Sequence, residues 1–198
     1  MSVENILTVF QLATPEEIEH GVTWYASAHC QCLDISENLD LPLNVVVGVV
    51  AALSPNNKWE RNVENARDLC TAYINGDSME SVKVSTYGKM KEKAWSILES
   101  NPTYDDTVTI LNGQKIVCFY QNIMGENTCT VDGHAYNIYH ASRQSLTGSI
   151  SIGKIEYHLI QDAYRKAGQS VLVHGRELTA YEMQAVTWVA WRRIHNIK

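Results

Sequence analysis

The first 57 residues contain no lysine and no arginine, although the whole chain has 16 of them. Phosphate groups are bound mainly by these two residue types. The net charge of −6 therefore argues against a protein that coats nucleic acid. Any polyanion is expected to contact the chain after residue 57, because the first 57 residues carry only acids, namely Glu4, Glu16, Glu17, Glu19, Asp34, Glu37 and Asp40.

Long apolar segments and cysteine motifs are also missing. No stretch approaches the roughly 18 apolar residues that a membrane-spanning helix needs, and residues 1–10 lack the basic start of a secretion signal. We therefore expect a cytoplasmic protein without a membrane partner. The five cysteines are scattered, and Cys30 and Cys32 have the wrong spacing for a zinc or redox pair. They are expected to be reduced core thiols, with no metal.

Proline is rare, with 4 in 198 residues, and no linker or repeat marks a domain boundary. A hydrophobic content of 45% is enough to bury a full core. We expect a single domain over residues 1–198, made of two helical lobes around one cleft.

Helical signals continue along almost the whole chain. Thr14 and Pro15 open a helix expected to reach about residue 38. The run 45–53 is apolar on every face, and its length and alanines favour a buried central helix over a strand. Thr179 and Glu182 have the spacing of a capping box. The other helices of this all-α prediction cover 59–73, 86–99, 104–111, 115–124, 133–142, 152–167 and 176–195.

Three segments in order carry a family pattern. The first is AALSPN at 51–56, followed by WERN at 59–62 and by Asn65 and Ala66; the second is GKMKEKA at 88–94; the third is LNGQK at 111–115, then Phe119, Asn122, Gly125 and TVDGH at 130–134. Over about residues 45–140 they resemble the helix-hairpin-helix (HhH-GPD) DNA glycosylase superfamily and its endonuclease III relatives. Short phage and mobile-element proteins of this fold are also similar, including a C-terminal pattern around Gln184, Trp188, Trp191 and Arg192.

The resemblance implies a bilobal helical array that acts on an extrahelical, modified base in DNA. It places the catalytic amine at Lys115 and the carboxylate at Asp132, facing one pocket. It further implies a monomer in a bacterial or phage-infected cell, without a cofactor. The cysteine-rich C-terminal loop that holds an iron–sulfur cluster in many relatives is absent, so no cluster is expected.

The residues themselves support this chemistry. Lys115 is expected at a helix start, where unpaired N–H groups disfavour a positive charge and favour the neutral, nucleophilic amine. The alternative is a solvated lysine at a turn. Asp132 is expected at the next helix start, either as a catalytic carboxylate or as a simple N-cap. One departure concerns Gly113 and Gln114, because the hairpin that aims its backbone amides at a DNA phosphate is about two residues shorter than the family pattern.

Further DNA- or substrate-binding candidates flank these two residues. Asn56 ends the first segment, and Trp59, Glu60 and Arg61 follow it, where an indole and an acid can read a flipped base. The alternative is that Trp59 packs between the two lobes while Glu60 and Arg61 pair on the surface. His134 is either a phosphate contact or a structural histidine. For Trp188, Trp191 and Arg192, core packing with an outward arginine is the favoured interpretation.

Three functions are compatible with the sequence. The first is an N-glycosylase and AP lyase that uses Lys115 and Asp132. The second is a phage-type transferase that puts an amine or amino acid onto an activated 5-methyl group of thymine, with Lys115 binding the leaving pyrophosphate and Asp132 or Glu60 deprotonating the amine. The third is a non-catalytic DNA- or protein-binding module.

Overall fold

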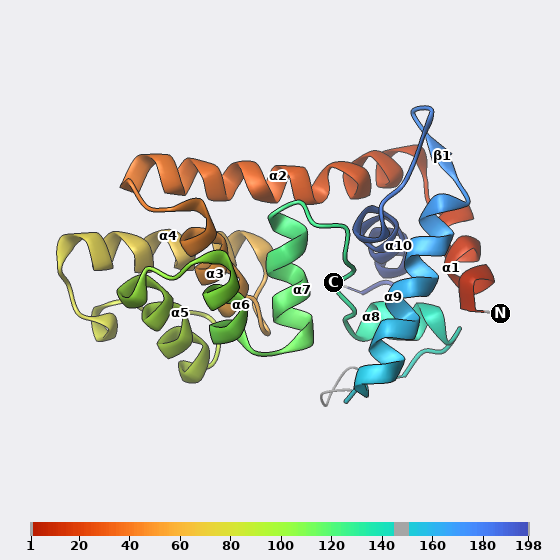
Figure 1. Ribbon diagram of the computed structural model, residues 1–198. Helices are drawn as coiled ribbons and strands as arrows, with labels where there is room; N and C mark the ends of the chain where they lie inside the picture. The colour runs from red at the N-terminus through yellow and green to blue at the C-terminus, as the bar shows by residue number, and fades with distance from the viewer. Residues whose placement is uncertain (1, 145–150, 198) are drawn as a thin grey trace. The chain divides into compact units, whose positions relative to one another are not determined.

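The computed structural model describes residues 2–144 and 151–197. These residues form ten α-helices, one 3₁₀ helix and one two-stranded hairpin, which confirms the all-α prediction (Figure 1). The chain divides into two compact units: unit 1 is residues 1–26 and 125–198, and unit 2 is residues 27–124. Helix α2 (Pro15–Leu39) contributes its first part to unit 1 and its second part to unit 2.

No helix within the described residues combines the length and the apolar character needed to cross a membrane.

Unit 2 is built around the predicted central helix. Helix α3 (Leu43–Leu53) is buried from Val45 to Leu53, and it contacts the four α-helices that follow it within this unit. A close approach explains the glycine in this run, since a Cβ on Gly48 would lie 2.8 Å from Cγ2 of Thr107. The elements that surround α3 are α4 (Trp59–Asn75), η1 (Met79–Ser81), α5 (Gly88–Ser100), α6 (Tyr104–Leu111) and α7 (Gln114–Ile123).

Unit 1 packs helices from both ends of the chain. The C-terminal helix contacts the three other helices that belong wholly to this unit. Gly21 of α2 also packs against this helix, where a Cβ would lie 2.4 Å from the Cα of Val186. The remaining elements are α1 (Ser2–Gln11), α8 (Gly133–Tyr139), α9 (Lys154–Gln169), β1 (Leu172–Val173), β2 (Arg176–Glu177) and α10 (Ala180–Ile194).

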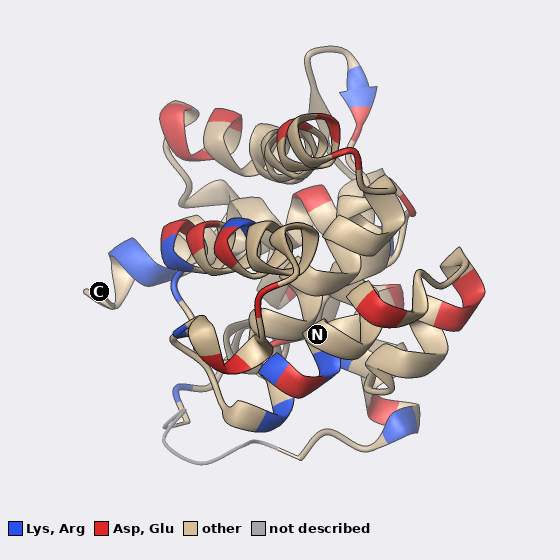
Figure 2. Cartoon of the chain, turned by 90° about the vertical axis from the view of Figure 1, so that its left-hand side faces the viewer, with Lys and Arg blue, Asp and Glu red and all other residues tan. Residues whose placement is uncertain are grey.

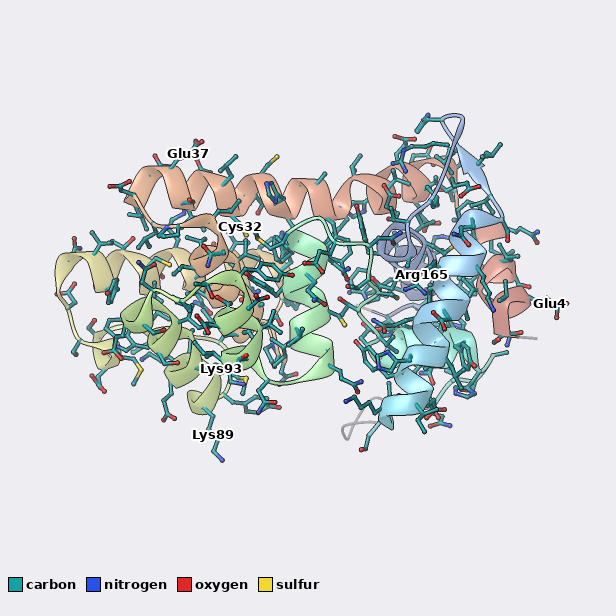
Figure 3. The ribbon with its side chains drawn as sticks, viewed as in Figure 1. Glu4, Cys32, Glu37, Lys89, Lys93 and Arg165 are labelled. Atoms are coloured by element: carbon teal, nitrogen blue, oxygen red, sulfur yellow. The ribbon has the colours of Figure 1, made fainter. Side chains whose placement is uncertain are left out.

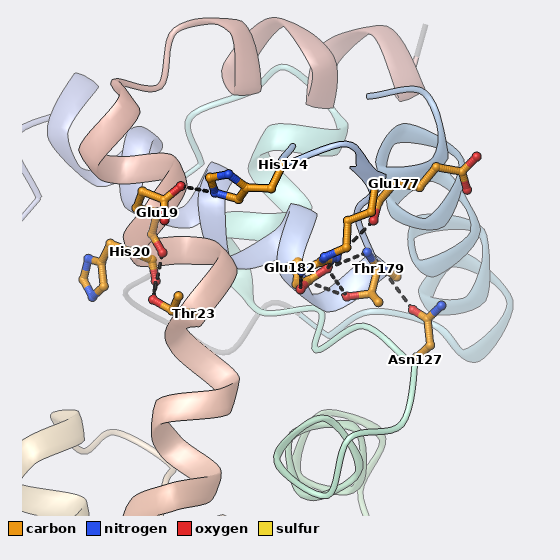
Figure 4. A network of polar contacts seen from close by, with 10 residues as sticks. Glu19, His20, Thr23, Asn127, His174, Glu177, Thr179 and Glu182 are labelled. Atoms are coloured by element: carbon orange, nitrogen blue, oxygen red, sulfur yellow. Dashed lines mark hydrogen bonds and ion pairs between the residues drawn. The ribbon is translucent and has the colours of Figure 1, made fainter. Parts of the chain in front are cut away.

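The start of α10 is the predicted capping box. The Thr179 side chain accepts the Glu182 backbone N–H, and the Glu182 carboxylate accepts the Thr179 N–H over 2.8 Å (Figure 4). Arg176 Nη2 adds a 2.6 Å contact to the same carboxylate. The predicted start at residue 176 is wrong, because residues 176–177 pair with β1 beyond a turn in which Gly175 has a φ of 78°. Helix α1 and this hairpin were not predicted.

Four cysteines are buried as expected, whereas Cys30 is exposed and corrects the prediction of five core thiols. Burial raises the pKa of Cys32 and of Cys70 to about 12, which keeps both as neutral thiols.

Three early acids contact basic side chains from later in the chain. Glu17 contacts Arg193 at 2.6 Å, Asp34 contacts Arg67 at 2.8 Å, and Glu19 contacts His174. Acidic and basic positions are mixed along α4, α5, α9 and α10, whereas α2 carries acids only (Figure 2). The acids of residues 1–57 are separated from the basic residues in the sequence, but some of them lie beside basic side chains within the folded units.

Candidate functional site

A two-residue turn joins α6 to the helix that carries Lys115. Asn112 takes the left-handed conformation, with a φ of 40°, and its N–H bonds to the Val108 carbonyl. Gly113 is extended and is the N-cap of α7. Because glycine has no side chain, α7 begins without a side-chain cap bond. Lys115 is the second residue of α7 and is exposed, while Gln114 is half-buried. The predicted helix start is confirmed, and it leaves backbone N–H groups open to an anion.

Lys93 holds this turn in place. Its Nζ donates to the carbonyl of Leu111, the last residue of α6. A helix C-terminus leaves carbonyls unpaired, so an ammonium group there satisfies one of them and complements the helix dipole. Lys89 lies on α5, as Lys93 does, but it extends away from the ribbon and is exposed (Figure 3). Lys93, the lysine just before Ala94 in the second segment, therefore has a structural role beside the turn that precedes Lys115.

An aromatic contact joins two of the predicted segments. The rings of Trp59 and Phe119 meet edge to face, with centroids 6.3 Å apart and an interplanar angle of 85°. Trp59 is the first residue of α4, and Phe119 lies four residues after Lys115 in α7. Residues four apart share one helix face. The start of α4 and the face of α7 that carries Lys115 are thus adjacent in unit 2.

The other candidates near Trp59 are mostly on the surface. Asn56 is exposed in the turn between α3 and α4, with a φ of 56°. Glu60 is exposed as well. Arg61 forms an exposed 3.5 Å pair with Glu64 and not with Glu60, which corrects the surface pairing considered above.

The asparagines of the first segment have structural contacts. Asn62 is buried, and its Nδ2 donates to the Val50 carbonyl over 3.0 Å. Asn65 is also buried, and its Oδ1 accepts the Ser85 N–H over 2.8 Å. They tie α4 to α3 and to the chain before α5.

Asp132 in unit 1 is a helix cap. Its Oδ1 accepts the Ala135 N–H over 2.8 Å at the start of α8, and its side chain is half-buried. Burial raises the pKa of Tyr164, and the charge of Asp132 adds a smaller contribution in the same direction. The side chain therefore has a structural role at the start of α8.

Two side chains of unit 1, His134 and Arg192, contact the indole of Trp188. The His134 ring approaches Trp188 edge to face with centroids 6.2 Å apart. The Arg192 guanidinium carbon lies 4.5 Å from the Trp188 ring centroid, a cation–π contact along α10. Both His134 and Arg192 are half-buried. Trp191, by contrast, is buried, as predicted for a core residue.

The candidate residues thus fall into two groups, one in each unit. Unit 2 holds Asn56, Trp59, Glu60, Arg61, Gly113, Gln114 and Lys115, and unit 1 holds Asp132, His134 and Arg192. That Lys115 and Asp132 face one cleft stays a prediction. Sequence reasoning did not assign site roles to Phe119 and Trp188. The available signal was spacing, because each lies four residues from a candidate basic residue.

These features define an all-α protein in which each unit carries an aromatic group beside a basic side chain. Residues 1–195 match the family described as "Family of unknown function (DUF7178)", and the chain belongs to that family. No curated protein and no solved structure matches the chain.

Proposed function

We propose that the protein is a DNA base-processing enzyme that breaks the N-glycosidic bond of an extrahelical, modified nucleotide. The Lys115 amine attacks C1′ of the sugar, the C–N bond to the base breaks, and the base leaves with a proton. Opening of the sugar ring then gives a Schiff base between Lys115 and C1′. Asp132 stabilises the positive charge that develops on the sugar.

The observation that carries this proposal is the contact between Trp59 and Phe119. It brings two aromatic rings to the face of α7 that bears Lys115, and an unpaired base is held in proteins by stacking on such rings. The uncapped start of α7 adds open N–H groups for a neighbouring phosphate. Adjacent parts of unit 2 would therefore bind the base, bind the phosphate and supply the amine nucleophile.

Borohydride trapping tests the proposal directly. The full chain is incubated with DNA that contains an abasic site or a modified base, and borohydride reduces any Schiff base to a stable cross-link. We expect cross-linking by the wild type and none by Lys115→Gln. DNA affinity should change by less than about twofold, because one exposed amine is a small part of a phosphate interface.

Lys89 provides the matched control. It is the second residue of α5, it is exposed, and its helix also begins without a side-chain cap bond. Lys89→Gln should cross-link like the wild type. Equal cross-linking by Lys115→Gln and the wild type would contradict the role of Lys115.

The base-modifying transferase is the second candidate, and the uncapped start of α7 favours it. The open N–H groups and Lys115 suit a leaving pyrophosphate, while Asp132 or Glu60 would deprotonate the incoming amine. In that case the wild type forms no cross-link, and mass spectrometry of nucleosides detects an amine on the 5-methyl carbon of thymine. Loss of that product in Asp132→Asn would favour the transferase, whereas DNA binding without any product favours a binding module.

A further inference from the structure

Three arginines lie near the C-terminal end of α10, and they differ in what they bind. Arg193 donates to the Glu17 carboxylate and to the Leu12 carbonyl over 2.7 Å. Arg143 donates to the His195 carbonyl over 3.2 Å, at the C-cap of α10. Arg192 has neither kind of acceptor among the described residues, and its guanidinium lies over the Trp188 indole. Two of these arginines therefore hold the fold together, whereas Arg192 keeps its N–H donors available.

The contact with the indole fixes the guanidinium without using its hydrogen bonds. An aromatic face attracts the cation but accepts no conventional hydrogen bond from its edge. Trp188 and Arg192 are four residues apart on α10, so the pair is held by one rigid helix. The His134 ring, from α8, contacts the same indole and limits its movement. A planar cation fixed in this way is preorganised for a phosphate oxygen pair.

We propose that Trp188, Arg192 and His134 form a binding site in unit 1 for one nucleotide of single-stranded DNA. Arg192 binds the phosphodiester, and the Trp188 and Arg192 side chains hold the adjacent unpaired base. Bases stack on aromatic rings and on guanidinium planes, and their faces are accessible only where the strand is unpaired. The choice of DNA as the polymer rests on the proposed function, while the choice of a single strand follows from the pairing of an indole with a guanidinium.

The test measures binding of the full chain to a fluorescent single-stranded oligodeoxynucleotide and to a duplex of the same sequence. Arg192→Met should weaken single-strand binding about tenfold, the size of a hydrogen bond to a charged group. The slope of log affinity against log salt should fall by about 0.7, the value for one phosphate contact on a single strand. Trp188→Leu should also weaken binding about tenfold, because one base loses its stacking partner.

Arg165 is the matched control, since it belongs to unit 1 and is paired with Asp162. Arg165→Met should bind single strands like the wild type. Arg192→Lys keeps the charge but loses the planar group, so it should preserve the salt slope and weaken binding by a smaller factor. This variant also keeps the test decisive if Arg192→Met fails to fold.

Each outcome decides the inference. It is overturned if the wild type does not bind the single strand, or if Arg192 and Trp188 variants bind within twofold of the wild type. Equal losses on single-stranded and duplex DNA would overturn the stacking role and leave a general phosphate contact. If the losses are confined to single strands while the wild type forms no borohydride cross-link, the binding site stands and the proposed glycosylase function fails.

Discussion

Lys115 and Asp132 both lie at helix starts, but the two helices depend on them differently. Lys115 is exposed, and α7 begins without any side-chain cap. Asp132 is half-buried, and its Oδ1 satisfies the Ala135 N–H at the start of α8. Among the residues that the structure describes, the lysine side chain has no hydrogen bond or ion pair that its replacement would remove, whereas the carboxylate has one. Loss of activity in a Lys115 variant can be assigned to chemistry, but an Asp132 variant must be separated into capping and chemistry.

The largest expected effect is on turnover in Asp132 variants. Asp132→Asn retains an oxygen that can accept the Ala135 N–H, so the stability of unit 1 should be nearly unchanged. Turnover should fall on the order of 10²-fold, because the neutral amide no longer stabilises positive charge on the sugar. Asp132→Ala should lose the same activity and in addition about 1 kcal/mol of stability, the usual value of an N-cap.

Urea unfolding and single-turnover kinetics on both variants measure the two parts. If Asp132→Asn turns over as fast as the wild type while Asp132→Ala is unstable, Asp132 is only a cap. In that case the start of α7 carries a reactive lysine, and the start of α8 carries a purely structural acid.

A smaller effect should come from Lys93, which supports the turn before Lys115. Lys93→Met removes the donor to the Leu111 carbonyl and should lower the free energy of unfolding by about 2 kcal/mol, the range for a hydrogen bond to a charged group. Lys89→Met, on the exposed side of the same helix, should change it by less than about 0.5 kcal/mol. Cross-linking through Lys115 should also decrease in Lys93→Met, since only two residues separate the end of α6 from the start of α7. Equal unfolding curves for the two variants would show that the Lys93 contact contributes nothing.

The parts of the fold that the sequence predicted are those with local causes. The buried run of α3, the Thr179 capping box and the start of α7 each depend on residues within a few positions of one another. Helix α1 was not predicted because its sequence carries no cap signal, and it is specified by packing against α8, α9 and α10. Residues 176–177 of the short hairpin before α10 were predicted as helix, since two-residue strands have too few residues for an alternating pattern.

The candidate site was predicted in its residues but not in its contacts. Lys115 and Asp132 were found from helix-start chemistry and from the family resemblance. The ring contact of Trp59 with Phe119 and that of His134 with Trp188 join residues more than 50 positions apart, and no spacing rule predicts such a pair from one sequence. The neutralisation of Glu17 by Arg193 was missed for the same reason.

The smallest expected effect is a difference in acid sensitivity between the two units. In unit 1, hydrogen bonding from Arg193 lowers the pKa of Glu17 below its ordinary value of 4.5. Burial alone would raise the pKa of Glu182, but hydrogen bonds from Arg176 and Thr179 outweigh it and lower that pKa as well. A carboxyl whose folded pKa is depressed contributes stability above its unfolded pKa and loses it as the pH falls through the folded value. Unit 1 should therefore weaken as the pH drops below about 4.5, the ordinary glutamate range.

Unit 2 depends less on such groups. Its comparable carboxylate is Asp34, whose pKa is lowered by a hydrogen bond from Arg67, but both side chains are exposed and such pairs contribute little. Hydrogen exchange at neutral pH and in acid should show α10 losing protection before α3 does. Glu182→Gln should reduce the difference in acid sensitivity between α10 and α3. The amide does not titrate, and it cannot form an ion pair with Arg176. Simultaneous loss of protection in α3 and α10 would mean that the units unfold together, and the helix starts of Lys115 and Asp132 would then share one stability.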